Sequence, residues 1–156
     1  MKKIIASALL SSVVFAAPAF AANTPFYVGL QVGDATSILG GFQIDKMFSA
    51  EVMHSSYNSY ASSLGVSGVA MLPLNVKGAP ALSAFGKAGV IRTTVETPSF
   101  CVIPGLCTPS IKESSTDIGF GVGAQYDFTP QLSARLGLDF GKYKSSDLYI
   151  GAIFKF

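Results

Sequence analysis

The only histidine in this sequence of 156 residues, His54, begins a His-Ser-Ser run that could support nucleophilic chemistry. A histidine can activate a serine hydroxyl, and in an extended segment His54 and Ser56 point to the same side. Such a base also needs a carboxylate within hydrogen-bonding distance to orient it. The sequence has no Asp or Glu between residues 52 and 95, and Glu51 would point to the opposite side from His54. We therefore expect no enzyme, no cofactor and no metal centre.

The two cysteines lie in a stretch rich in Pro, Thr and Ser, T-P-S-F-C-V-I-P-G-L-C-T-P-S. Pro104-Gly105 between them is a turn pair that can bring Cys101 and Cys107 together. Because the N-terminus resembles an export signal, the chain is expected to pass through an oxidising compartment. The alternative is a pair of free thiols, and metal binding is disfavoured because His54 is far away in sequence. We predict a Cys101–Cys107 disulfide.

The first 21 residues have the three parts of a secretory signal peptide. Met1-Lys2-Lys3 is basic, residues 4–17 form an apolar run, and Ala19-Phe20-Ala21 is an A-x-A cleavage site. A retained helical anchor is the alternative, but the run is short and contains serines. We predict that residues 1–21 are removed and that residues 22–156 form a single domain.

The composition favours a membrane protein without membrane-spanning helices. The chain is 49% hydrophobic and 13% charged. Removing Lys2 and Lys3 leaves nine basic residues against nine acidic ones, and no basic stripe suggests nucleic-acid binding. No later stretch approaches the ~18 uninterrupted apolar residues of a transmembrane helix. The other structure that satisfies every backbone group in a bilayer is a closed β-barrel.

Eight segments of the mature chain show the two-residue period of a β-strand. In the clearest pair, from Ile118 to Phe140, apolar residues alternate with glycine and polar residues, as expected for a lipid-facing side and a lumen-facing side. The facing of the fourth segment stays open, because both of its sides are apolar or small. The predicted strands are residues 26–33, 39–45, 50–57, 64–74, 81–95, 116–128, 132–143 and 147–156.

The connections between these segments are expected to alternate in length, as they do in outer-membrane barrels. We predict tight second, fourth and sixth connections, and a fifth loop over residues 97–113 that is the longest. Aromatic residues near the strand ends suggest two interfacial girdles. The group predicted at the turn side comprises Phe26, Tyr27, Phe48, Tyr126, Phe128 and Phe156.

The final segment, D-L-Y-I-G-A-I-F-K-F, alternates over its whole length and ends on Phe156. A soluble domain rarely exposes such an ending, whereas a membrane strand can use its last aromatic residue as an interfacial anchor. We predict that this strand pairs with the first one to close the barrel.

The stretch G-V-G-A-Q-Y-D-F-T-P-Q-L-S-A-R-L-G-L-D-F, from Gly121 to Phe140, resembles the sixth-to-seventh-strand hairpin of the outer membrane protein A transmembrane domain. The shared features are Tyr126, the Thr129-Pro130 turn and Arg135. The resemblance implies an all-β, eight-stranded, antiparallel up-and-down barrel in the outer membrane of a Gram-negative bacterium. It also implies that Phe156 is a terminal signal read by the barrel-assembly machinery.

Members of that family carry ionisable side chains that meet inside the barrel and plug or gate it. Two of these positions match Glu51 and Arg135, whereas the family's carboxylate on the sixth strand falls on Gln125 and its basic partner on the fourth strand has no counterpart. We therefore expect a lumen polar network built on Glu51 and Arg135. Lys87 and Asp139 are possible additions to it. The inward row of Gly119, Gly121 and Gly123 suggests local water-filled pockets.

The resemblance favours a structural or surface-interaction role, in envelope integrity or adhesion, with a largely plugged lumen. The alternative is a narrow, gated, porin-like channel. A lipid-modifying outer-membrane enzyme and a soluble lipocalin-type binder, whose apolar face would point inward, are less favoured. The expected partners are outer-membrane lipid, the barrel-assembly machinery and a host or surface ligand bound through residues 97–113. The protein is expected to be a monomer.

Overall fold

The computed structural model describes residues 25–58, 60–74, 76, 79, 81–97, 101–103, 106–107, 110–141 and 144–156. The predicted signal peptide, residues 1–21, lies outside this range and stays a prediction. The described residues include no apolar helix of the length that a membrane crossing requires.

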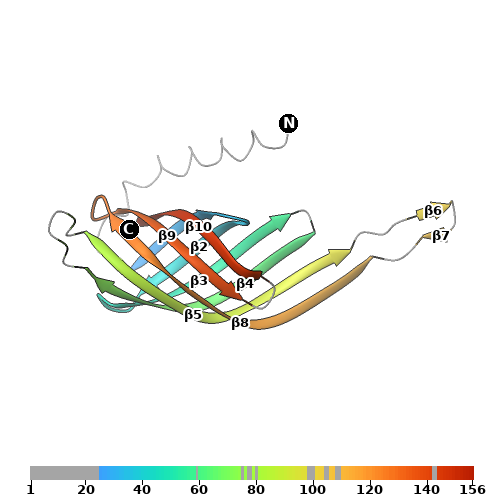
Figure 1. Cartoon of the computed structure of the whole chain (residues 1–156), viewed down its shortest axis with the longest axis horizontal. Coiled ribbons are helices and arrows are strands. Elements are labelled where there is room, and N and C mark those ends of the chain that lie inside the picture. Colours follow the sequence, from blue (N-terminus) through green and yellow to red (C-terminus); the bar gives the residue numbers. More distant parts are fainter. Residues whose placement is uncertain are drawn as a thin grey trace, which may run out of the picture.

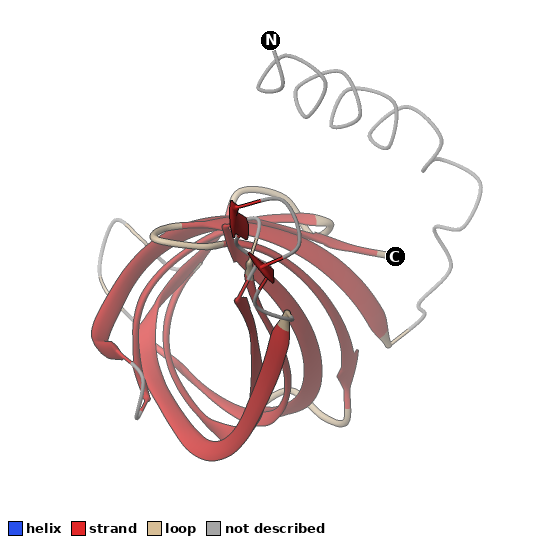
Figure 2. Ribbon diagram, turned by 90° about the vertical axis from the view of Figure 1, so that its right-hand side faces the viewer, coloured by secondary structure: helices blue, strands red, loops and turns tan. Residues whose placement is uncertain are grey.

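Eight long strands form a closed antiparallel barrel in the order β1-β10-β9-β8-β5-β4-β3-β2 (Figures 1 and 2). A separate two-stranded sheet pairs β6 with β7. The barrel strands are β1 (Phe26–Val32), β2 (Thr36–Gln43), β3 (Phe48–Asn58), β4 (Ala61–Pro73), β5 (Leu82–Thr97), β8 (Ile111–Asp127), β9 (Leu132–Gly141) and β10 (Lys144–Lys155). The short strands are β6 (Cys101–Ile103) and β7 (Leu106–Cys107).

The last strand closes the ring against the first, as predicted. β1 pairs with β10 in a register that places Val28 opposite Phe154 and Val32 opposite Ile150. Every barrel strand therefore has a neighbour on both sides, and the barrel wall has no open edge within its closed part. The predicted fold class is confirmed.

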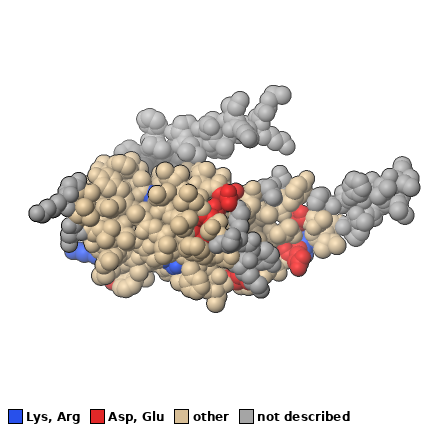
Figure 3. All heavy atoms as spheres, in the orientation of Figure 1, with Lys and Arg blue, Asp and Glu red and all other residues tan. Residues whose placement is uncertain are grey.

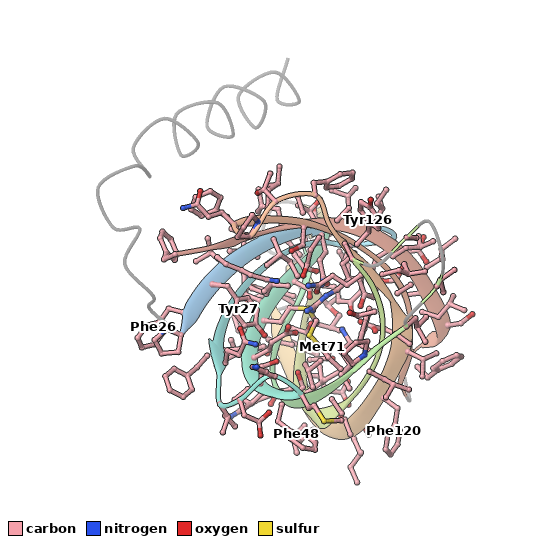
Figure 4. The ribbon with its side chains drawn as sticks, turned by 90° about the vertical axis from the view of Figure 1, so that its left-hand side faces the viewer. Phe26, Tyr27, Phe48, Met71, Phe120 and Tyr126 are labelled. Atoms are coloured by element: carbon pink, nitrogen blue, oxygen red, sulfur yellow. The ribbon has the colours of Figure 1, made fainter. Side chains whose placement is uncertain are left out.

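Apolar side chains point outward along the strands, because alternate residues of a strand face opposite sides of the sheet. Phe26, Phe120 and Tyr126 project away from the barrel, whereas Tyr27 and Met71 point inside (Figure 4). The outer surface in Figure 3 carries few charged atoms. The facing of β4, which the sequence left open, is now assigned: Val69 lies inside, and the outward row is Leu64, Val66, Gly68, Ala70 and Leu72.

The start of β1, the end of β10 and the connections β2–β3, β4–β5 and β8–β9 lie at one end of the barrel, which we call the terminus end. The predicted alternation in connection length is wrong. The β4–β5 connection at the terminus end spans residues 74–81, whereas three connections at the opposite end span only residues 33–35, 59–60 and 142–143. This β4–β5 connection is long because it contains a small β-bridge between Val76 and Ala79.

The fifth connection is mainly paired strand and not the loop expected over residues 97–113. β5 and β8 continue past the barrel in unbroken register up to the pair Thr97–Ile111, with the β6–β7 sheet at the tip (Figure 1). β9 pairs with β8 only from Phe120 onward. We call the projecting ribbon, residues 96–97 and 111–119 with β6 and β7, the arm, and this end of the barrel the arm end.

Candidate functional site

The centre of the lumen holds a buried ion pair between β3 and β9. Arg135 Nη1 lies 2.6 Å from Glu51 Oε1, and the two side chains are 1% and 2% exposed. Both residues occupy inward positions of their strands, which the two-residue period dictates. A pair so deeply buried holds its charges only if the remaining polar atoms are also satisfied.

The Glu51 carboxylate has a second partner in Tyr27. The Tyr27 hydroxyl lies 2.8 Å from Glu51 Oε1 and 2.9 Å from Ser49 Oγ. Because a phenol has one proton, Tyr27 donates it to the carboxylate and accepts a hydrogen bond from Ser49. Gly41, opposite Tyr27 on β2, leaves the space that the ring occupies, since a Cβ there would collide with it.

The Arg135 guanidinium is held on its other edges by Gln125 and Phe85. Gln125 Oε1 accepts hydrogen bonds from Nε at 3.2 Å and from Nη2 at 3.1 Å. The guanidinium carbon also lies 4.7 Å from the centre of the Phe85 ring, in a cation–π contact. A planar group with several fixed donors suits this arrangement, and a lysine could not reproduce it.

The network continues from Gln125 to the rim at the terminus end. Gln125 Nε2 donates to Asp127 Oδ1 at 2.9 Å, and Ser133 Oγ donates to the same oxygen. Lys155 Nζ lies 3.1 Å from Asp127 Oδ2. An unbroken chain of hydrogen bonds therefore links two balanced ion pairs, Glu51–Arg135 and Asp127–Lys155.

A third ion pair lies closer to the arm end. Lys87 Nζ is 2.7 Å from Asp139 Oδ2 and sits 4.9 Å from the centre of the Tyr149 ring. The space beside the inward glycines is largely filled by these side chains, because a Cβ on Gly121 would collide with Asp139 and Lys87. The predicted water-filled pocket shrinks here to a cavity of about 30 Å³.

Apolar side chains fill the rest of the barrel centre. One cluster comprises Tyr27, Leu39 and Ile153, with Met53 against it. A second comprises Val69, Phe85 and Tyr149, with Met71 against it. The remaining space divides unequally, with a cavity of about 20 Å³ at the terminus end and one of about 260 Å³ at the arm end.

The structure brings three of the five predicted network residues into direct contact: Glu51, Gln125 and Arg135. Lys87 and Asp139 form a separate pair. The sequence reasoning missed Tyr27, Ser49, Asp127, Ser133 and Lys155 as network members. Tyr27 was predicted in the turn-side aromatic girdle, and this is wrong, because its ring is buried in the lumen. The two-residue period places Tyr27 in the lumen-facing row of β1, and this pattern could have identified it as a lumen residue.

His54 lies on the outer face of β3, whereas Glu51 faces the lumen. The two side chains therefore lie on opposite sides of the wall. No group of three or more potential metal ligands occurs among the residues that the structure describes.

The cysteines and the last residue occupy the two ends of the molecule. Cys101 and Cys107 are register partners in the β6–β7 sheet. Their side chains lie outside the described residues, so the disulfide stays a prediction. Phe156 N donates to Phe26 O at 3.2 Å. The Phe156 ring packs edge-on against the Phe154 ring, with the ring centres 5.4 Å apart. The role of Phe156 as an assembly signal also stays a prediction.

Comparisons with known proteins place the chain among outer-membrane barrels. Residues 7–156 match the family model described as outer membrane protein beta-barrel domain. The N-terminal β-barrel domain of Pseudomonas aeruginosa OprF superposes with a TM-score of 0.64 at 14% identity, covering 84% of this chain and 95% of that one. Neisserial surface protein A superposes with a TM-score of 0.58 at 16% identity, covering 85% and 98%.

A de novo designed transmembrane β-barrel superposes with a TM-score of 0.56 at 18% identity, covering 86% of this chain and 98% of the design. Identities this low show a common fold alone. No curated protein matches the chain. The family match confirms the predicted resemblance and assigns the protein to the outer membrane: the chain belongs to the outer membrane protein beta-barrel domain family.

Proposed function

We propose that this protein is a plugged outer-membrane barrel with a surface-interaction role, and that the arm is the element that meets the partner. The single observation that carries the proposal is the difference in length between the connections at the arm end. Three connections there are confined to residues 33–35, 59–60 and 142–143, while β5 and β8 continue together into the arm.

The arm end faces the outside in this proposal, because outer-membrane barrels place their longer extensions on the extracellular side, and the arm between β5 and β8 is the longest connection. The arm also offers backbone groups for recognition. On β8, residues 111–119 pair with β5 on one side, and β9 begins to pair on the other side only at Phe120. An exposed strand edge of this kind binds extended peptide segments by adding a strand.

The filled lumen supports a structural role over transport. Arg135, Glu51, Tyr27 and Phe85 occupy the barrel centre, and the cavities at the two ends share no lining residue. An eight-stranded barrel is about wide enough for its own side chains to fill. The narrow gated channel remains the second candidate. The observation that favours it is the position of one buried ion pair, Glu51–Arg135, across the lumen between β3 and β9.

Shortening the arm tests the proposed role. Residues 96–112 are replaced by a two-residue Asn-Gly turn, which suits a hairpin between antiparallel strands. The matched control shortens the β4–β5 connection, residues 75–80, at the terminus end. We expect the arm variant to lose most attachment of expressing cells to the target surface, while the control retains it.

Both variants should show a heat-modifiable shift on gels, which reports a folded barrel. Equal attachment by a folded arm variant and the wild type would exclude the arm as the interaction element. The barrel itself would then remain as the structural component.

A further inference from the structure

A cavity with a volume of about 260 Å³ lies in the lumen at the arm end. Its rim includes Ala35 and Gly141, next to the short connections of that end, and its inner part includes Met53 and Tyr149. Below it, the Glu51–Arg135 network and the two apolar clusters fill the barrel. The side chains of the network and of the two clusters do not fill this cavity.

The cavity is acidic. Asp117, Asp139 and Asp147 all line it, and its lining includes no Lys or Arg in the described part of the chain. Lys87 pairs with Asp139 from the neighbouring small cavity, at 2.7 Å from Oδ2. Carboxylates in a partly enclosed site attract cations.

Three buried polar atoms belong to residues that line this cavity and have no hydrogen-bond partner among the described residues. They are Gln31 Nε2, Asp139 Oδ1 and Tyr149 Oη. Gln31 and Tyr149 are only 2% and 4% exposed. A buried polar atom without a partner is costly, so nearly all such atoms in native proteins are paired. A cationic donor in the cavity can pair with the two oxygens, Asp139 Oδ1 and Tyr149 Oη, whereas Gln31 Nε2 is itself a donor and needs an acceptor.

The rest of the lining is mixed: Met53, Ile91 and Val95 provide an apolar part, and Ser37, Ser55, Ser63 and Thr93 provide hydroxyl groups. Its volume lies slightly below the range of ~300–1,000 Å³ that is typical for pockets that bind drug-sized ligands. The site therefore combines carboxylates for a charged group with an apolar wall for a short hydrocarbon chain. We propose that this cavity binds a small aliphatic amine in its protonated, cationic form.

In this arrangement the ammonium group donates to Asp139 Oδ1 and to the Tyr149 hydroxyl oxygen, and the methylene groups contact the apolar wall. A second amine in a linear diamine would meet Asp147. The proposal is independent of the arm, which shares with the cavity lining only Asp117 and Ile118. The attachment assay therefore tests the arm, and the amine titration tests the cavity. One proposal can fail without the other.

Three probes with the same four-carbon chain test the chemistry: 1,4-diaminobutane, 1,4-butanediol and succinate. Each is titrated by calorimetry into the folded mature protein in detergent micelles at constant salt. We expect saturable binding of the diamine that weakens as salt increases, and no saturable binding of the diol or the diacid. Equal heats for diamine and diol, or no saturable binding of the diamine, would overturn the proposal.

Two substitutions locate the site. Tyr149→Phe removes only a hydroxyl that has no described partner, so the barrel should fold and diamine affinity should fall about tenfold, the effect of one charge-assisted hydrogen bond. Asp139→Asn should reduce affinity at least as much. Glu96→Gln is the matched control, because it removes a carboxylate that pairs with Lys112 and does not line the cavity. Unchanged diamine affinity in folded Tyr149→Phe and Asp139→Asn would exclude this cavity as the site.

Discussion

Gln125 and Asp127, two positions apart on the inward side of β8, are joined by a hydrogen bond of 2.9 Å from Gln125 Nε2 to Asp127 Oδ1. The same amide accepts from Arg135 through its oxygen. A neutral side chain that both donates and accepts can therefore connect a cation on one side to an anion on the other. A carboxylate at this position could not donate to Asp127.

Gln125→Glu is expected to lower the free energy of unfolding by roughly 1–3 kcal/mol, because it replaces a donor to Asp127 with a second buried negative charge. The defect should shrink as the pH is lowered and the introduced carboxylate becomes protonated, since a carboxylic acid can donate again. Urea unfolding of the barrel in lipid vesicles measures both effects. Gln131→Glu, the same change in the exposed β8–β9 turn, is the control and should be nearly neutral.

Arg135→Met should lower the free energy of unfolding by roughly 3–5 kcal/mol, because it leaves the buried Glu51 carboxylate without its cation. Adding Glu51→Gln should recover much of this loss, since the remaining amide can still accept from Tyr27. Lys112→Met breaks an exposed pair with Glu96 and should cost about 0–1 kcal/mol. Additive losses in the double variant would show that the two groups do not stabilise the barrel as a pair.

Planar-bilayer recordings distinguish a plug from a gate. We expect no steady current from the wild type or from Arg135→Ala, because Phe85, Tyr149, Leu39 and Ile153 still fill the barrel centre after the guanidinium is removed. Lys112→Ala provides the control for the effect of losing a positive charge. A current that appears only in Arg135→Ala would favour the gated channel over the plugged barrel.

The predicted disulfide should affect the arm and not the barrel. Cys101 and Cys107 are opposite one another in a sheet whose strands pair only with each other in the described structure, and antiparallel partners have the Cα separation that a disulfide needs. Thiol alkylation followed by mass measurement should show no modification before reduction and two modified cysteines after it. Unfolding of the barrel should be the same for the wild type and Cys101→Ser. Modification of both cysteines without reductant would disprove the disulfide.

Deleting Phe156 should impair assembly in cells more than stability in vitro. The residue contributes one backbone hydrogen bond to Phe26 and an edge-on ring contact with Phe154, so the refolded variant should lose only about 1 kcal/mol. The amount of heat-modifiable protein in the outer membrane should fall much further. Phe128→Ala removes another exposed aromatic from the terminus end and should assemble normally. Equal membrane levels of the two variants would argue against a terminal signal.

The two-residue period predicted the parts of the fold that lie in the membrane, where one side of each strand must be apolar. It assigned the outward row from Ile118 to Phe140 and the closure of the last strand on the first. It failed for the ribbon that leaves the membrane. Four consecutive residues of the arm, 112–115, are polar, and a strand with water on both faces has no apolar alternation to detect.

The site was predictable only in part, for a related reason. Glu51 and Arg135 are charges in an otherwise apolar or small-residue pattern, so they attract attention in the sequence. Tyr27 carries no such signal, because a tyrosine near a strand end suits an interfacial girdle as well as a lumen. Its role depends on the glycine opposite it on β2, Gly41, which is a relation between strands. The link from Asp127 to Lys155 likewise joins positions far apart in the chain.

The continuous register of β5 and β8 has a mechanical consequence. Because both strands run without interruption from the barrel wall to the pair Thr97–Ile111, a pull on the arm along its axis is transmitted directly into the barrel. The hydrogen bonds to β4 and β9 lie perpendicular to the strands, so this force loads them in shear, many at once. A flexible loop would stretch first and transmit little. The paired strands therefore couple the arm directly to the barrel wall.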